Sequence, residues 1–378
     1  MELVQSAERA ALRDVVHRYL SEHYDFQQRR RTLQSEPGFT RARWCEFAQL
    51  GWLGAAVPEA LGGSGGTAGD VAVILDEFGR FLVLEPLLSC AVLPIGVLAE
   101  SAGLPRYAGM VEQLASGRQL FTVAHRESPA RGNVHFVETR ARALPGGRYV
   151  LTGNKSNVVA ATEADKIIVS ARVAGGCDEP AGLSLFLLDP SLPGIEQRRY
   201  RTIDGRPAAD LTLRAVEVGP DAVLGTDGSA APVLSSAFEQ FIVGSCAEAV
   251  GIMDAVVATT VDYLKTRRAY GSTLSSYQAL QHRLADMLAE VELSRSMLIR
   301  ALHALSAQSG HQRRKEVSGA RILIGQASRF VASSAIQLHG AMGVVDEHIV
   351  GHFLKRLTVT FALCGSVEFH LRQYTTPV

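Results

Sequence analysis

The sequence predicts an α+β fold in which two helical domains flank a β-domain, and three observations along its 378 residues lead to this prediction. In the first third, apolar residues recur every three or four positions, as on one face of a helix. The middle third contains short β-branched and aromatic runs bounded by Gly, Pro and Asp, which favour strands. Long helical patterns return after about Ala230. We therefore expect a helical domain at 1–119, a small antiparallel β-domain at 120–228 and a four-helix bundle at 229–378.

The N-terminal part is expected to form helices separated by a glycine-rich connector. One apolar helix face comprises Leu12, Val15, Val16, Tyr19 and Leu20. The connector at 62–66 does not fit a phosphate-binding loop, because no strand leads into it and no Lys-Ser/Thr pair follows. A further helix is expected to begin at Asp70 and end near Arg80. The basic run at 29–31 is expected to be a solvated surface cluster.

The middle part is expected to form a sheet of short strands. Strand-forming runs occupy 121–123, 149–152, 166–169, 185–188 and 211–213. Between the first two runs, Leu144-Pro145-Gly146-Gly147-Arg148 combines a proline with two glycines. This combination predicts a hairpin turn.

One apolar stripe in the C-terminal part keeps an approximately heptad rhythm. Its members are Leu280, Leu284, Met287, Val291, Leu298, Leu302 and Leu305. Such a stripe is typical of antiparallel bundle helices or of an oligomer seam. Further along, His348 and His352 have the i,i+4 spacing of two metal ligands, but the sequence offers no third well-placed ligand. We therefore expect no metal site.

The composition excludes several classes of function. Lys+Arg and Asp+Glu both total 38, so no net charge favours nucleic acid or an anionic membrane. The five cysteines lack CxxC spacing, and their odd number favours reduced thiols and a cytoplasmic location. The first residues lack the basic and apolar regions of a signal peptide. Pro, Gly or charged residues interrupt each apolar stretch before about 18 residues, so we expect no membrane span.

Four ordered blocks carry a resemblance to a known family. The first runs from Leu50 to Gly65 and continues as Glu77-Phe78-Gly79-Arg80. The second is 149–155, followed by Ala164-Asp165. The third is 267–274 with Gln278 and 284–287. The fourth combines 335–343 with 361–366. Along nearly its whole length, the chain thus resembles the acyl-CoA dehydrogenases.

The resemblance implies FAD as the cofactor and an acyl-CoA as the substrate. In similar proteins, an Arg and a Gln like Arg267 and Gln278 reach across a subunit interface to a neighbour's FAD. A guanidinium at this position offers a fixed fork of donors to a pyrophosphate. The cofactor-binding residues carried over in this way are Arg267, Tyr270, Gln278, Gln337, Gly340 and Ser366. The family also implies an electron-transfer flavoprotein or similar acceptor as a partner.

The chain departs from the family at the positions that serve its own flavin and substrate. Cys364 replaces the usual glutamate, and a thiol is a poor substitute for a carboxylate base. Segment 127–133 occupies the place of the Thr-Glu-Pro-x-x-Gly-Ser-Asp strand, and 157–159 replaces the Trp-Ile-Thr that walls the flavin. Some relatives carry their glutamate at a position that aligns with Phe241. Glu239 lies two residues away, about 200° around a helix, and would need a register shift to serve.

Residues given to a neighbour's FAD are present, whereas those serving the chain's own site are mostly lost. We expect a subunit that completes a partner's FAD site in trans, in a heterotetramer with a homologous acyl-CoA dehydrogenase subunit. This pattern resembles the paired enzymes that actinobacteria use on steroid side-chain thioesters. Two alternatives stay open: a self-sufficient homomeric enzyme with a displaced base, and a non-redox thioester-binding relative. Near the end of the β-domain, the polar groups expected to approach a CoA or a neighbouring subunit belong to Arg201, Thr202, Asp204 and Arg206.

Overall fold

The computed structural model describes residues 6–99 and 105–376, and it divides the chain into two compact units. The helical unit comprises residues 1–31, 68–83 and 242–378, and the mixed unit comprises 32–67 and 84–241. Each unit is therefore assembled from segments that are far apart in the sequence. The order of helices, then strands, then helices along the chain is confirmed.

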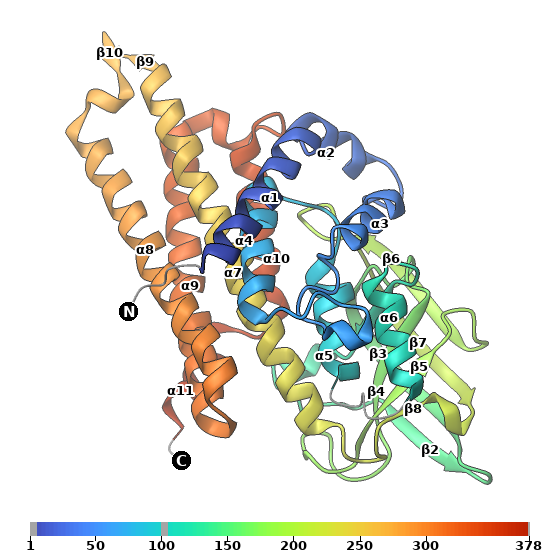
Figure 1. Cartoon of the computed structure of the whole chain (residues 1–378). Helices are drawn as coiled ribbons and strands as arrows, with labels where there is room; N and C mark the ends of the chain where they lie inside the picture. The colour runs from blue at the N-terminus through green and yellow to red at the C-terminus, as the bar shows by residue number, and fades with distance from the viewer. Residues whose placement is uncertain (1–5, 100–104, 377–378) are drawn as a thin grey trace. The chain divides into compact units, whose positions relative to one another are not determined.

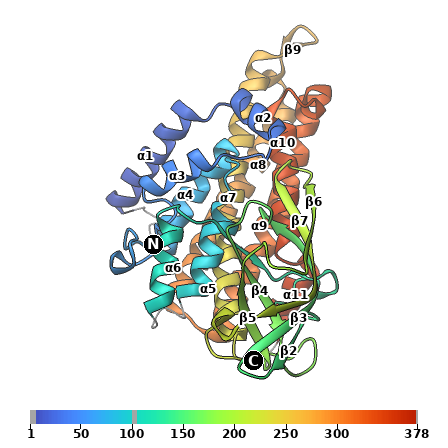
Figure 2. The ribbon, with the colours of Figure 1, turned by 90° about the vertical axis from the view of Figure 1, so that its right-hand side faces the viewer.

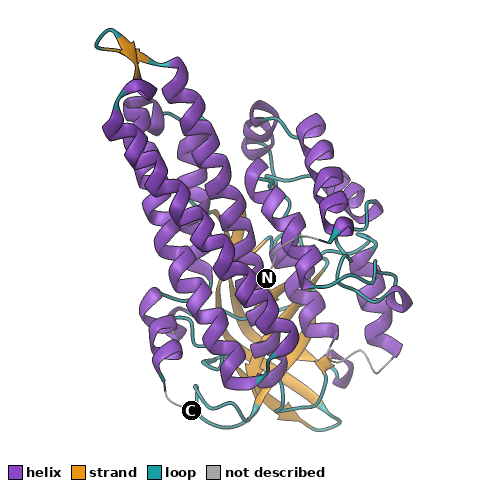
Figure 3. Ribbon diagram, turned by 60° about the vertical axis from the view of Figure 1, so that its left-hand side comes forward, coloured by secondary structure: helices purple, strands orange, loops and turns teal. Residues whose placement is uncertain are grey.

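Long helices dominate the helical unit, as the periodicity predicts (Figure 3). They are α1 (Ala7–His23), α4 (Ala68–Phe81), α7 (Ala231–Thr266), which begins in the mixed unit, α8 (Gln278–Ala307), α9 (Gly310–His339), α10 (Ile349–Leu363) and α11 (Val367–Thr375). Three members of the apolar stripe of α8 are buried, namely Met287, Val291 and Leu298, and the other four are half-buried; α8 packs against α9. Helix α4 extends the predicted range by two residues at its start and one at its end.

Helices α4 and α7 approach each other through two glycines. A Cβ atom on Gly79 would overlap the carbonyl oxygen of Glu248, and one on Gly251 would overlap the carbonyl oxygen of Asp76. The two backbones are thus in direct contact. A second link inside this unit is a bidentate ion pair in which Arg356 of α10 donates to both oxygens of Glu248 at 2.7 Å. Both side chains are buried.

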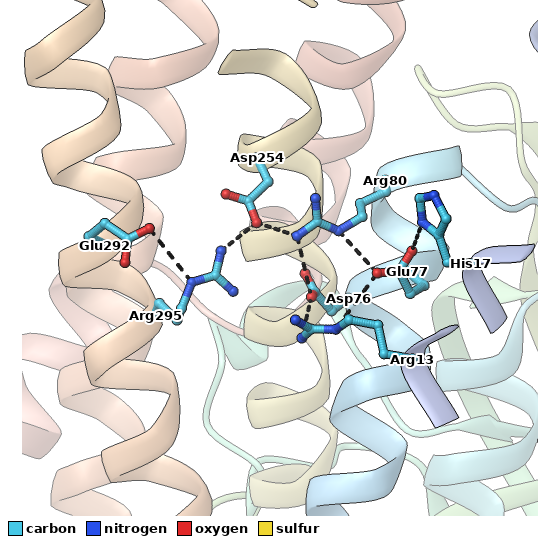
Figure 4. A network of polar contacts seen from close by, with 8 residues as sticks. All are labelled: Arg13, His17, Asp76, Glu77, Arg80, Asp254, Glu292 and Arg295. Atoms are coloured by element: carbon cyan, nitrogen blue, oxygen red, sulfur yellow. Dashed lines mark hydrogen bonds and ion pairs between the residues drawn. The ribbon is translucent and has the colours of Figure 1, made fainter. Parts of the chain in front are cut away.

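An ion-pair network joins α1, α4, α7 and α8 (Figure 4). Its members are Arg13, His17, Asp76, Glu77, Arg80, Asp254, Glu292 and Arg295. Asp254 of α7 lies at its centre, where it pairs with both Arg80 and Arg295. Burial raises the pKa of Asp76, although three guanidinium groups oppose that shift. The network therefore pairs the buried carboxylates of Asp76 and Glu77 with guanidinium groups that stay partly exposed.

Replacing Asp254 with asparagine is expected to lower the free energy of unfolding by about 2 kcal/mol, because two partly buried guanidinium groups lose their shared carboxylate. Urea denaturation measures this change. Glu292→Gln is the matched control, since Glu292 is exposed and makes a single 3.8 Å contact with Arg295. We expect the control to change stability by less than about 0.5 kcal/mol. Equal effects of the two substitutions would contradict the central place of Asp254.

The mixed unit contains an eight-stranded sheet, of which Figure 2 labels β2 to β7. The strand order is β6-β7-β3-β2-β4-β5-β8, and β1 pairs with β4. The strands are β1 (Phe121–Ala124), β2 (Arg140–Leu144), β3 (Arg148–Val159), β4 (Lys166–Arg172), β5 (Leu183–Leu188), β6 (Ile195–Arg201), β7 (Pro207–Val218) and β8 (Val223–Leu224). All five predicted strands and the 144–148 hairpin are confirmed. The prediction of a purely antiparallel sheet is wrong, because β1 and β2 both run parallel to β4.

The remaining elements of the mixed unit are short. They are α3 (Arg41–Gln49), η1 (Glu59–Leu61), η2 (Leu88–Val92), α5 (Leu93–Ala99), α6 (Pro105–Ala115), η3 (Ser128–Ala130) and η4 (Pro220–Ala222). Helix α2 (Phe26–Gln34) crosses the boundary between the two units. The glycine-rich segment 62–66 is a turn and loop after η1, in agreement with its prediction as a connector.

One expectation from the sequence is wrong here. Arg29 is only 2 % exposed, because its Nε donates to the Leu82 carbonyl at 2.8 Å and anchors α2 to the end of α4. The basic run is therefore not a fully solvated cluster. Helix α7 contains an 18-residue window with a mean hydropathy of 1.8, although charged residues such as Glu248 and Asp254 interrupt the apolar residues of this helix. Because 72 % of that window is buried inside the structure, its apolar character fits a core helix.

Candidate cofactor-binding site

The end of α7 carries the exposed basic hairpin that the sequence assigns to cofactor binding. Arg267 follows α7 directly, and strands β9 (Arg268–Ala269) and β10 (Ser272–Thr273) form the hairpin beyond it (Figure 1). Tyr270 stands at the turn with a positive φ of 51°, and 97 % of it is exposed. The Tyr277 hydroxyl braces the hairpin by donating to the Ala269 carbonyl at 3.0 Å. The hairpin is thus held in shape while Arg267 and Tyr270 face solvent.

The other cofactor-binding residues that the family resemblance implies in the helical unit lie at helix ends. Gln278 is the first residue of α8, and Gln337 lies in the last turn of α9; both are exposed. Gly340 begins the short helix η6 (Gly340–Val344) with φ 59° and ψ −135°, a conformation that glycine tolerates and other residues rarely adopt. No atom lies within 4 Å of where its Cβ would be, so a ligand can approach its backbone closely.

An aromatic cluster of Tyr263, His339 and His348 brings these helix ends together. The ring of Tyr263, one turn before Arg267, stacks on His339 with centroids 4.4 Å apart, and its hydroxyl donates to the His339 carbonyl at 3.3 Å. His348 lies against His339 at 4.8 Å. Burial lowers the pKa of both histidines. The structure therefore places the segment of Arg267 beside the segment of Gln337 and Gly340.

The junction between α10 and α11 holds the position where a base was expected. Cys364 caps α10 and is buried, and Gly365 follows with φ 95°. The Ser366 hydroxyl accepts from the Phe369 N–H at 3.2 Å, so this side chain caps α11. His370 contacts the Cys364 carbonyl at 2.7 Å. The turn is rigidly built, but it carries a thiol and no carboxylate.

Buried partners surround this turn. Arg321 of α9 donates to the Phe361 carbonyl at 2.6 Å and stacks on the Phe361 ring at 4.0 Å, and so satisfies the last turn of α10. Burial raises the pKa of the neighbouring Cys246 thiol to about 12. The Cys246 thiol therefore stays protonated at neutral pH and does not replace the missing carboxylate base. These partners could not be read from the sequence, since they come from α7 and α9.

In the mixed unit, segment 127–133, which departs from the family's pattern, begins with a buried ion pair between Glu127 and Lys155. Glu127 accepts from Lys155 Nζ at 2.7 Å, from Thr139 Oγ1 at 2.6 Å and from two backbone N–H groups. Burial lowers the pKa of Lys155 to about 8. Burial alone would raise the pKa of Glu127, but Lys155 and the hydrogen-bond donors outweigh it and hold the pKa below its ordinary value. The Glu127 carboxylate is thus fully occupied by partners within the fold.

A polar cavity of about 550 Å³ lies beside this ion pair and was not foreseen from the sequence. It is lined by residues of η3 and of strands β3, β6 and β7, among them Ser128, Ser156, Gln197, Arg198 and Asp210. A bulge in β3 near Asn157, which has φ 53°, distorts the sheet at this place. In the cavity lining, the Asp210 carboxylate accepts hydrogen bonds from Arg198 at 2.6 Å and from the Asn157 N–H at 3.0 Å.

The remaining candidates are engaged within the fold. Glu239 is buried in the part of α7 that belongs to the mixed unit. Arg201 is exposed, and it donates to the Leu33 and Ser35 carbonyls at 2.7 and 2.8 Å at the end of α2. Its neighbours Thr202, Asp204 and Arg206 form the β6–β7 turn, where the Thr202 N–H donates to the Arg206 carbonyl. Within residues 6–99 and 105–376, no three His, Cys, Asp or Glu side chains gather as metal ligands, and His348 caps α10.

Comparison with family models matches three consecutive parts of the chain. The N-terminal domain of acyl-CoA dehydrogenase matches residues 6–96, the middle domain matches 123–216 and the C-terminal domain matches 231–376. These three matches together cover most of the chain and follow the family's own domain order.

Similar proteins span nearly the same length. The probable acyl-CoA dehydrogenase YngJ of Bacillus subtilis is 28 % identical, and the match covers 82 % of each chain. Acyl-CoA dehydrogenase IpdE2 of Mycolicibacterium smegmatis is 26 % identical over 99 % of each chain. Among solved structures, a variant of the Tcur3481-Tcur3483 steroid ACAD is 27 % identical with a TM-score of 0.86, over 97 % of this chain and 96 % of that one.

Proposed function

Because this chain belongs to the acyl-CoA dehydrogenase family, whose cofactor is FAD, we propose that it is the cofactor-completing subunit of a heteromeric member. Its partner would carry out the α,β-desaturation of an acyl-CoA. When bound, FAD accepts the hydride that leaves the β-carbon of the thioester. The observation that carries the proposal is a contrast: cofactor groups are exposed at one end of the helical unit, while Cys364 stands where the base is needed.

The exposed groups fit a dinucleotide. Arg267 offers a planar fork of donors that suits a pyrophosphate, and Gln278 and Gln337 can each donate and accept. Gly340 leaves open space for a close backbone approach. Tyr270 offers an almost fully exposed ring. Ser366 is less suited as a side-chain ligand, because its hydroxyl already caps α11.

The positions that would serve a flavin and substrate bound by this chain itself fit the cofactor less well. The Glu127 carboxylate is saturated by Lys155, Thr139 and backbone N–H groups. Cys364 offers no carboxylate for removal of the α-proton. We therefore propose that the partner supplies both the flavin cradle and the catalytic glutamate, while this chain lends Arg267 and its neighbours across the interface.

We extend the proposal to the partner and the substrate class. The steroid ACAD that this chain resembles at 27 % identity is named after two chains, which supports a homologous partner and a heterotetramer. The same name supports a steroid acyl group, and the sequence resemblance to the paired actinobacterial enzymes favours a side-chain thioester. An electron-transfer flavoprotein or similar carrier would reoxidise the flavin. The free cysteines favour a cytoplasmic complex.

Co-expression with candidate homologous subunits tests this proposal. We expect a yellow complex that forms only from two different chains and contains about one FAD per pair of chains. Size-exclusion chromatography, the flavin absorbance and mass spectrometry of the complex measure its composition. A yellow homotetramer of this chain that oxidises an acyl-CoA unaided would overturn the proposal.

A displaced base on α7 is the second candidate, and it rests on the buried carboxylate of Glu239. Under our proposal, Glu239→Gln is expected to change the turnover of the complex by less than about 3-fold, because the base comes from the partner. Stopped-flow reduction of the flavin by an acyl-CoA measures this rate. A loss of about 1000-fold or more, as expected on removing an essential base, would favour the self-sufficient enzyme instead.

A further inference from the structure

The aromatic cluster links two stretches of chain that our proposed function uses together. Tyr263 precedes Arg267 by one helical turn, and His339 directly precedes Gly340. Their rings are stacked with an interplanar angle of 24°, and the Tyr263 hydroxyl holds the His339 carbonyl. The ring contact and this hydrogen bond both join the end of α7 to the end of α9. The cluster can therefore set the spacing between the two cofactor-facing segments.

His339 is held in one tautomer by its own helix. Its Nδ1 lies 2.8 Å from the Ala335 carbonyl, which only accepts hydrogen bonds, so Nδ1 carries the proton. The opposite ring nitrogen, Nε2, is buried and has no hydrogen-bond partner in the described part of the chain. A proton added there would find no acceptor and would carry a positive charge into a buried site. The cluster is thus built for a neutral imidazole.

The surroundings offer no compensation for such a charge. The titratable groups that face His339 are Tyr263 from α7 and His348 from the start of α10. His348 uses its Nδ1 as an acceptor for the Val350 N–H, and within the described residues no carboxylate forms an ion pair with either histidine. A protonated His339 would therefore repel a protonated His348 and weaken the stacked arrangement.

We propose that His339, with Tyr263, is a positioning residue that fixes the distance between Arg267 and the Gln337–Gly340 segment, and that it does so only as the neutral imidazole. This inference rests on the proposed function, in which both segments hold one FAD. Burial depresses the pKa of His339, so the neutral form prevails at neutral pH. As the pH falls through that lowered value, the positioning is lost, which predicts a weaker hold on the cofactor in acid.

Spin labels measure the spacing without any cofactor. We would label Ser272→Cys and Met342→Cys, both at exposed positions, in the full chain with Cys45 and Cys177 changed to serine; the other cysteines are buried. Electron resonance distance measurement is expected to give a narrow distribution at neutral pH and a broad one at a pH below the lowered pKa of His339. Tyr263→Leu is expected to broaden it at both pH values. His339→Phe keeps the stacked ring and should give a narrow distribution at both.

The FAD affinity of the two-chain complex provides the second readout. Tyr263→Leu is expected to weaken FAD binding by about 10-fold, whereas His303→Phe, an exposed histidine on α8, serves as the matched control and should change it less than about 2-fold. Identical distance distributions in all variants would overturn this inference whatever the cofactor does. If the spacing depends on the cluster but no substitution in this chain changes FAD binding, the positioning role of the cluster is supported. The proposed function is then contradicted instead.

Discussion

Replacing Gly251 with alanine is expected to destabilise the helical unit by at least about 3 kcal/mol, or to prevent its folding. The added methyl group would overlap the Asp76 carbonyl oxygen, which belongs to the backbone of α4 and cannot rotate away. The helices would have to separate, and Gly79 and the Glu248 carbonyl would lose their contact as well. Urea denaturation followed by circular dichroism measures the loss.

The matched control is the same substitution at Gly109 of α6. No atom lies within 4 Å of the position where its Cβ would be. Because alanine favours helix over glycine by up to about 1 kcal/mol, Gly109→Ala is expected to stabilise the chain slightly. The two substitutions should therefore have opposite signs. A Gly251→Ala protein as stable as the unchanged chain would mean that α4 and α7 do not touch at this glycine.

The contrast between these glycines shows where sequence reasoning stops. Apolar periodicity predicts α4, α8 and the other long helices, because each helix must bury one face. It cannot tell which glycine lies at a helix crossing, since both Gly109 and Gly251 occur inside helices. The close approach at Gly251 depends on which helices meet in space. The same limit explains Arg29, whose burial follows from the position of the Leu82 carbonyl and not from its basic neighbours.

The candidate site follows the same division. Arg267, Gln278, Gln337 and Gly340 lie in contiguous motifs, so the sequence could identify them. The aromatic cluster that joins their segments involves Tyr263 and residues more than seventy positions later in the chain, and no periodicity connects them. The Glu127–Lys155 pair likewise joins the start of η3 to strand β3 through side chains. Such pairs depend on strand register and helix packing, which the order of residues alone does not reveal.

Replacing Arg267 with methionine is expected to weaken FAD binding to the two-chain complex by about 30-fold or more. Methionine keeps much of the length of the side chain but removes the guanidinium, and loss of a charge-assisted pair with a phosphate costs about 2 kcal/mol or more. Fluorescence titration of the flavin-depleted complex with FAD measures the dissociation constant. Since Arg267 is exposed at the end of α7, the stability of the chain itself should not change.

Arg268→Met separates this specific contact from a general loss of positive charge. Arg268 is the next residue and is equally exposed, but its guanidinium turns back to the Gly271 carbonyl at 3.4 Å. We expect Arg268→Met to change the FAD dissociation constant by less than about 3-fold. Both substitutions should reduce the salt dependence of that constant to a similar extent, because each removes one positive charge. Equal losses at both positions would point to diffuse attraction and would contradict a fork of donors on the pyrophosphate. A loss of FAD affinity for Arg267→Met alone would support a specific contact between this residue and the cofactor. Such a contact is expected if the partner chain holds most of the flavin.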